Sequence, residues 1–190
     1  MRLIQELKKR ENENKSTEDI FNLNQPKQKK FKNADQALEY LCWVVNADTL
    51  FDFSLKTYDF ELVILVAKYT QKDPKEYLPY LKRLQEMDPV LMKYQINMDL
   101  KDYEDALSEI SKDEKHIDIA LDLIKKYELF ELSFFLYTKN QEILENIFES
   151  YGDNLHEKKK YFEAGYAFIK NKNYEKALES FKVIIYLILL

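Results

Sequence analysis

The chain has 190 residues, 46% of them hydrophobic, with only two glycines and four prolines. Hairpin turns favour Gly or Asn-Gly pairs, so this composition leaves little material for β-hairpins and favours a helical protein. The length is that of a single domain. The net charge of −5 gives no overall attraction to phosphate polymers, because that attraction scales with the cations that displace counterions.

A single cysteine, Cys42, excludes an internal disulfide and a thiolate metal cluster, and it is typical of a reducing compartment. The N-terminus lacks the unbroken apolar stretch of a secretion signal. The longest apolar run, Val183–Leu190, is far shorter than the roughly 20 residues that span a bilayer as a helix. We therefore expect a protein without a membrane span that is cytoplasmic, with the nucleus as a second compartment.

The N-terminal region is rich in Lys, Glu, Asn and Gln and has few apolar anchors. Such a composition buries too little surface to offset the entropy of ordering, so residues 1–32 are predicted to be a charged, partly disordered segment. Within it lies a basic cluster with one aromatic residue, which could contact RNA or be a solvated linker: Lys27, Lys29, Lys30 and Lys32.

Helical periodicity begins at residue 33. Leu38, Leu41, Cys42 and Val45 share one helical face, and Asn33 can cap the start together with Gln36. We expect a shorter helix after Asp48.

The segment from Phe60 to Ala67 is apolar on nearly every side, as in a helix at the centre of a packed array. Its β-branched residues also permit a buried strand, but the chain offers no similar run to pair with it. We therefore predict a helix.

Two Asp-Pro steps, Asp73-Pro74 and Asp88-Pro89, indicate helix starts, because Asp accepts bonds from free amides and Pro suits the first helical position. Glu76 is expected to complete a capping box with Asp73. Pro79 should kink this helix or end it early.

The same apolar spacing recurs further along the chain, with short polar breaks between the segments. The last two segments resemble a tetratricopeptide repeat (TPR) hairpin, with small Gly165 and Ala177 at the close approach and bulky Phe168 and Phe181 as partners. The predicted fold is all-α, an irregular α-solenoid of TPR-like helical hairpins over residues 33–190, with a truncated C-terminus. The four segments are Tyr103–Ile110, Ile117–Ile124, Tyr161–Phe168 and Tyr174–Phe181.

The sequence offers no catalytic, cofactor or metal site. His116 and His156 lie forty residues apart in charged surroundings, which is typical of solvated histidines. Cys42 falls on an apolar helix face, where a thiol behaves as a small hydrophobe. Two glycines cannot build a phosphate-binding loop. We expect a protein that is not an enzyme and binds no cofactor.

The aromatic residues, 14 Tyr and 12 Phe, mostly fall at helical spacing and are expected in the core. Tyr127, Tyr137 and Tyr151 lie near predicted helix ends. They are therefore the better candidates for a partner surface.

From Ala37 to about Leu107, the order of motifs resembles the helical region of the largest subunit of the Elongator complex, the family also called IKAP. The most specific stretch is Gln71–Pro79, because capping alone would leave Gln71, Tyr77, Leu78 and Pro79 unconstrained. Weaker similarity continues to Phe181.

The resemblance implies a scaffold in a complex that installs carboxymethyl-type groups at the tRNA wobble uridine. Its partners would be the other Elongator subunits, including the catalytic subunit, a radical S-adenosylmethionine and acetyl-CoA dependent one, and any tRNA contact would be indirect. Against the family as a whole, we expect this chain to lack the β-propellers, the dimerisation region and the basic tRNA-binding patch. The alternative is a helical-repeat adaptor of another assembly, such as a vesicle-coat or trafficking complex.

Overall fold

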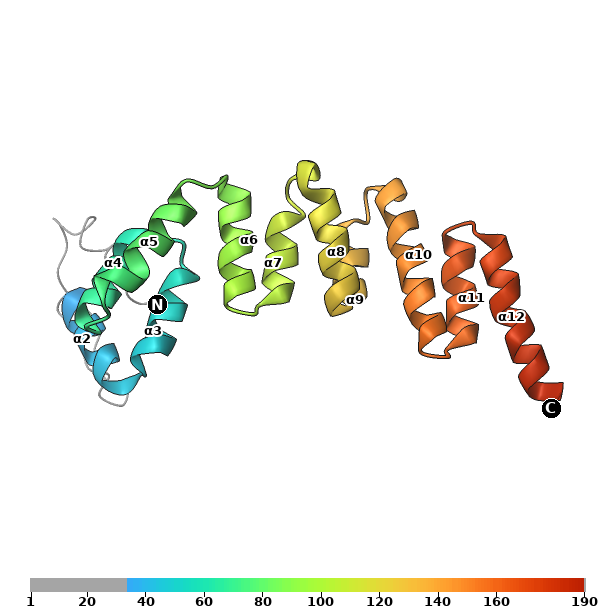
Figure 1. Ribbon diagram of the computed structural model, residues 1–190, viewed down its shortest axis with the longest axis horizontal. Helices are drawn as coiled ribbons and strands as arrows, with labels where there is room; N and C mark the ends of the chain where they lie inside the picture. The colour runs from blue at the N-terminus through green and yellow to red at the C-terminus, as the bar shows by residue number, and fades with distance from the viewer. Residues whose placement is uncertain (1–33, 190) are drawn as a thin grey trace, which may run out of the picture. The chain divides into compact units, whose positions relative to one another are not determined.

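The computed structural model describes residues 34–189 (Figure 1). Within that range every regular element is a helix, which confirms the all-α prediction. In chain order the helices are α2 (Ala34–Val44), α3 (Ala47–Leu55), α4 (Phe60–Tyr69), α5 (Pro74–Gln85), α6 (Pro89–Asp99), α7 (Tyr103–Ile110), the 3-10 turn η1 (Glu114–His116), α8 (Ile117–Tyr127), α9 (Phe130–Leu136), α10 (Gln141–Glu157), α11 (Tyr161–Lys170) and α12 (Tyr174–Leu189).

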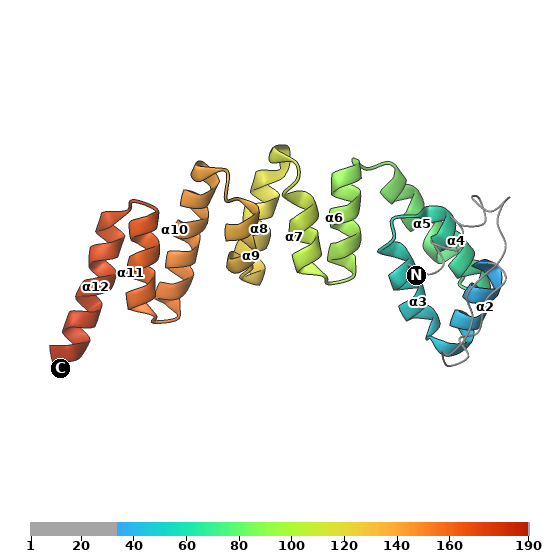
Figure 2. The same ribbon diagram turned by 180° about the vertical axis from the view of Figure 1, so that it is seen from behind.

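The chain divides into two compact units, Met1–Met87 and Asp88–Leu190. Figure 2 shows the helices of both units from behind. The prediction that residues 33–190 form one continuous solenoid stays a prediction, as does the partly disordered segment 1–32, which lies outside the described residues.

In the first unit, α2, α3 and α4 pack against one another. Leu62, Val63 and Val66 of α4 are fully buried, which confirms the prediction of a buried helix over the strand alternative. Leu38 of α2 is buried as predicted. Tyr77 of α5 is buried as well, and its ring lies 6.2 Å from that of Phe51 in α3.

Short acidic and amide side chains cap the helix starts. The Asn46 side chain accepts a hydrogen bond from the amide of Asp48, so α3 begins one residue before Asp48, a cap that the sequence reading missed. Asp73 and Asp88 cap α5 and α6 as predicted.

The predicted capping box between Asp73 and Glu76 is wrong. Asp73 Oδ1 instead accepts from the amide of Lys75 at 2.9 Å. Because Pro74 has no N–H, the Lys75 amide is the first free donor of α5, and it lies within reach of the short Asp side chain.

Of the two effects predicted for Pro79, an early end of the helix is wrong, because α5 continues to Gln85, and a kink stays a prediction. Proline removes the hydrogen bond to the carbonyl four residues earlier, here that of Lys75. Lys75 and Pro79 are both exposed, so water can solvate this carbonyl, while Leu81 and Leu84 anchor the rest of α5 in the core.

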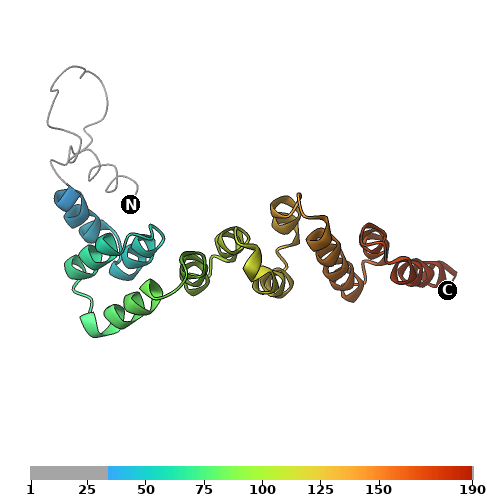
Figure 3. The same ribbon diagram turned by 90° about the horizontal axis from the view of Figure 1, so that it is seen from above.

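In the second unit, a core formed by α6 to α10 is followed by a second one formed by α10 to α12. Seen from above, the helices of this unit lie in space in the same order as in the sequence (Figure 3). α9 and α10 had not been predicted individually, and α12 extends beyond the predicted segment to Leu189.

Several helices end with a left-handed residue that is not glycine. After α6, Lys101 has a φ of 60°, and the amide of Asp102 donates to the carbonyl of Asn97 at 2.8 Å. Asp102 then caps α7. Gln71, Lys159 and Lys172 occupy the same position after α4, α10 and α11. This closure makes connections of only three or four residues and explains how hairpins form in a chain with two glycines.

The two glycines lie inside helices, at the points where neighbouring helices approach most closely. A Cβ at Gly152 of α10 would meet the Phe168 ring of α11 at 2.6 Å, and a Cβ at Gly165 of α11 would meet the Phe181 ring of α12 at 2.5 Å. The predicted role of Gly165 and Phe181 is therefore confirmed. The pairing of Gly152 with Phe168 was missed, although both pairs are 16 residues apart.

We predict that Gly152→Ala destabilises the protein by up to about 2 kcal/mol, because overpacking costs roughly 1–3 kcal/mol and the gain in helix propensity offsets about 1 kcal/mol of it. Thermal unfolding followed by circular dichroism measures the effect. Phe168→Leu in the same chain should recover part of the loss by making room. A melting temperature at or above that of the wild type for Gly152→Ala alone would contradict the close contact.

Pro79→Ala should stabilise the protein by about 1–3 kcal/mol, because it restores the hydrogen bond to Lys75 and removes the ring clash. Chemical denaturation measures the difference. Pro74→Ala is the matched control, since Pro at the first helical position loses no helical bond and its replacement should give no such gain. Equal effects of the two substitutions would refute this account of Pro79.

Candidate interaction surfaces

The residues considered for catalysis are divided between the two units, Cys42 in the first and His116 and His156 in the second. His116 is half-buried beside Asp113, and His156 is exposed with its ring edge-on to Tyr161. Among residues 34–189, no group of three or more His, Cys, Asp or Glu side chains could hold a metal ion. Partial burial raises the pKa of the Cys42 thiol, so less of it is in the reactive thiolate form.

The lysines considered for RNA contact, Lys27, Lys29, Lys30 and Lys32, lie outside the described residues. Their role therefore stays a prediction.

The three tyrosines considered for a partner surface pack against the core of the second unit. Tyr137 is only 7% exposed, so its placement on a surface was wrong: it follows a short helix, but its ring turns inward and joins the core. Tyr127 stacks on Tyr103 with ring centroids 3.6 Å apart. Tyr151 is half-buried against Phe130.

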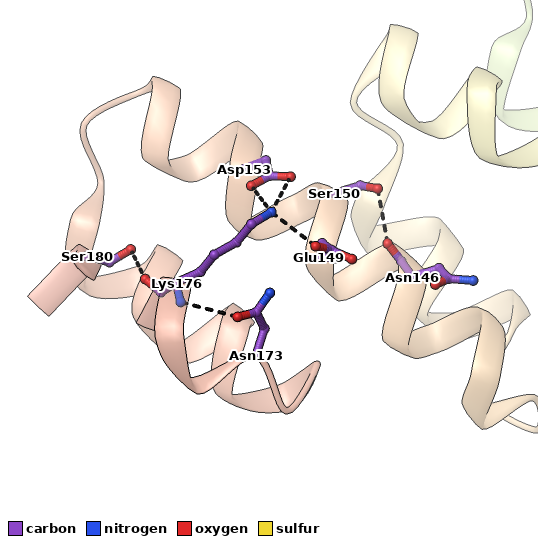
Figure 4. A network of polar contacts seen from close by, with 7 residues as sticks. All are labelled: Asn146, Glu149, Ser150, Asp153, Asn173, Lys176 and Ser180. Carbon is purple, nitrogen blue, oxygen red and sulfur yellow. Dashed lines mark hydrogen bonds and ion pairs between the residues drawn. The ribbon is translucent and has the colours of Figure 1, made fainter. Parts of the chain in front are cut away.

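A network of charged groups joins α10 to α12 (Figure 4). Lys176 Nζ lies 3.0 Å from Glu149 Oε1 and 3.0 Å from Asp153 Oδ1. The same ammonium group lies over the Phe168 ring of the intervening α11, at 5.3 Å from its centroid. The hydrogen bond from Lys176 lowers the pKa of Glu149, against a smaller effect of desolvation.

Two further ion pairs connect residues about one hairpin apart. Lys158, after α10, pairs with Glu128, after α8, and Lys172, after α11, pairs with Glu145 of α10. The hydrogen bond from Lys158 lowers the pKa of Glu128, as that from Lys172 lowers the pKa of Glu145. Each of these pairs joins segments that are far apart in the sequence.

Aromatic side chains are exposed on α11. Phe162 and Tyr166 contact each other edge to face at 5.0 Å between centroids, and both approach Phe181 of α12. Exposed apolar side chains of α12, among them Leu178 and Ile185, extend this surface.

In the first unit, a hollow of about 280 Å³ lies beside an ion pair between Lys72 and Asp48, whose atoms are 2.9 Å apart. Lys72 Nζ also lies 4.8 Å from the centroid of the Phe51 ring. Partial burial raises the pKa of Asp52, which Lys72 counteracts. The hollow is therefore a polar site whose lining includes an internal ion pair.

A different hollow lies along the outward side of α5. Its volume is about 460 Å³, and its lining is apolar, from Leu78 and the rings of two prolines together with the stems of two lysines. We call this surface the α5 groove and define it by its lining residues: Pro74, Lys75, Leu78, Pro79 and Lys82.

Between residues 34 and 189, none of the helices combines the length and the apolar character needed to cross a membrane.

Both units match models of known protein families. Residues 3–84 match the model described as ELP1 alpha-solenoid, and residues 91–185 match the model described as ELP1 TPR domain. The fold and these matches define an α-helical repeat protein, an α-solenoid followed by a TPR domain. The boundary between the matches falls close to the division of the structure after Met87.

Curated relatives support the same assignment. The chain is 40% identical over 150 residues to the putative elongator complex protein 1 of Xenopus laevis, covering 78% of this chain and 13% of the relative. To elongator complex protein 1 of Oryctolagus cuniculus it is 39% identical, covering 78% of this chain and 11% of the relative. To that of Saccharomyces cerevisiae it is 33% identical over 137 residues, covering 70% of this chain and 10% of the relative.

The chain belongs to the elongator complex protein 1 family. The resemblance inferred from Gln71–Pro79 is thereby confirmed, and the Elongator prediction is favoured over the vesicle-coat alternative. The chain spans between about a tenth and an eighth of the length of these relatives.

The ion pair between Lys176 and Glu149 predicts that the stability of the fold depends on pH. Because the pKa of Glu149 is lowered in the folded state, its ion pair stabilises the fold above the unfolded-state pKa, and this contribution is lost as the pH falls through the folded-state pKa. Lys176→Met should lower stability at pH 7 by at most about 1 kcal/mol, since the pair is largely exposed, and the difference from the wild type should shrink towards pH 3.

Melting temperatures of the two proteins between pH 7 and pH 3 test this dependence. Lys182→Met is the matched control, because Lys182 is an exposed residue of the same helix. A gap between wild type and Lys176→Met that stays constant with pH, or a similar gap for Lys182→Met, would contradict the role of the ion pair.

Proposed function

We propose that the chain is a non-catalytic scaffold segment of the Elongator complex, which positions other subunits during carboxymethyl-type modification of the tRNA wobble uridine. The observation that carries this proposal is the match of both units, in order, to the two helical modules of one Elongator subunit family. The relatives' own names place them in that complex.

The physical character of the molecule supports the same proposal. Stacked helices bury one face on their neighbours and present extended outer surfaces, which is how repeat proteins bind partners. Here large apolar side chains remain exposed on α5, α11 and α12, among them Leu78, Phe162 and Tyr166. Exposed apolar side chains gathered in this way mark sites of protein contact.

We infer that the partners are the other Elongator subunits, including the catalytic radical S-adenosylmethionine and acetyltransferase-like subunit, and that any tRNA contact is indirect. We further propose a cytoplasmic location, with the nucleus as a second compartment. The homodimerisation region of the family is not assigned to this chain.

The test compares two sets of substitutions in the tagged full-length native protein. Cys42→Ser, His116→Gln and His156→Gln together remove the side chains considered for chemistry, whereas Gly152→Trp disrupts the packing of α10 on α11. The readouts are the subunits that co-purify, identified by mass spectrometry, and the modified wobble uridine in cellular tRNA.

A scaffold predicts that the triple variant retains both subunits and modification, and that Gly152→Trp loses both. Loss of modification in the triple variant, with all subunits still bound, would instead show that these side chains act in the chemistry. Retention of all subunits and full modification by Gly152→Trp would show that this segment is not needed for assembly.

A further inference from the structure

The α5 groove lies on the side of α5 that faces away from the core of its unit. Tyr77, Leu81 and Leu84 form the buried side of this helix. Leu78 lies beside this buried side and is 46% exposed. Nearly half of its side chain is therefore open to contact with another molecule.

Pro79 is costly for the fold. In the second turn of a helix, proline forfeits a backbone hydrogen bond, and its ring crowds the carbonyl of Lys75. Its exposed ring has no offsetting place among the buried side chains. Residues that break a local rule without a gain in packing tend to lie at functional sites.

The charge of the α5 groove favours an acidic ligand. Lys75 and Lys82 are seven residues apart, so they lie on the same helical face, one on each side of Leu78. Both are exposed, and neither forms an ion pair within the described part of the chain. A carboxylate on either side of an apolar anchor would find a partner there.

The residues that line the α5 groove favour a protein helix over single-stranded nucleic acid as its ligand. Single-stranded nucleic acid is bound by aromatic stacking platforms and several cations, whereas this groove offers Leu and Pro side chains with two lysines. An amphipathic helix placed in an apolar groove is a common mode of protein recognition. The volume of about 460 Å³ has room for a few apolar side chains.

We propose that the α5 groove is the docking site for an acidic amphipathic helix of another Elongator subunit. An apolar side chain of that helix packs on Leu78 and Pro79, and carboxylates one or two turns away pair with Lys75 and Lys82. This inference rests on the proposed function, and it names the chemistry by which this part of the scaffold holds a partner.

The test places a photo-crosslinking amino acid at Gln85, which is exposed and lies one helical repeat beyond Leu78 on the same face. The full-length native protein is irradiated in its own cells, and the linked peptide is identified by mass spectrometry. The expected product joins Gln85 to a segment of another Elongator subunit in which acidic and apolar residues alternate at helical spacing.

Variants then test the contacts. Lys75→Glu with Lys82→Glu should lower the yield of this product by about tenfold or more, as should Leu78→Asp, which removes the apolar anchor. Phe53→Asp is the matched control, because Phe53 is 53% exposed on α3 of the same unit and lies outside the groove. It should leave the yield unchanged, and unaltered melting temperatures should show that all variants fold.

Other products would overturn the inference. Crosslinks to the same chain, to a second copy or to RNA would each assign the groove a different occupant, and so would a partner segment without acidic residues. An absent crosslink with all subunits co-purifying would overturn this inference and leave the proposed function standing. Failure of the subunits to co-purify with the wild type would overturn both.

Discussion

The close approach of α10, α11 and α12 determines how the last three helices of the second unit pack. Gly152 makes room for the Phe168 ring, and Gly165 makes room for the Phe181 ring. α11 therefore supplies the bulky residue of one contact and the small residue of the next. Because the two contacts have the same spacing along the chain, the same packing is repeated, as expected for a helical array in which each element is buried only by its neighbours.

The charged groups follow from this packing. Once α10 and α12 lie on either side of α11, Lys176 reaches Glu149 and Asp153 and covers the Phe168 ring. Each pair is largely exposed and contributes little by itself. Because these pairs join α12 to α10, they form only when the helices of the unit are correctly aligned.

In the first unit, by contrast, some surface residues do not follow from the packing of the core. Among the described residues its core is formed by α2, α3 and α4 and by the inner side of α5, whereas Leu78 and Pro79 are exposed on α5. The stretch Gln71–Pro79 first indicated the family, and the structure separates its residues into two groups. Asp73 and Tyr77 maintain the fold, and Leu78 and Pro79 form the α5 groove.

The sequence by itself determined the helical class, the position of most helices and the family. These features depend on local chemistry: the apolar period of each helix, the Asp-Pro starts at Asp73 and Asp88, and the specific motif that contains them. It also identified Gly165 and Phe181, because the TPR pattern fixes their spacing.

Only the tertiary structure decided which side chains remain on the surface. Tyr137 proved to be buried although it follows a helix end, Pro79 proved to be tolerated, and Lys176 proved to join separate helices. The physical reason is common to all three. Burial, the solvation of a backbone carbonyl and the reach of a lysine depend on neighbours that are distant in the sequence, and local patterns contain no information about those neighbours.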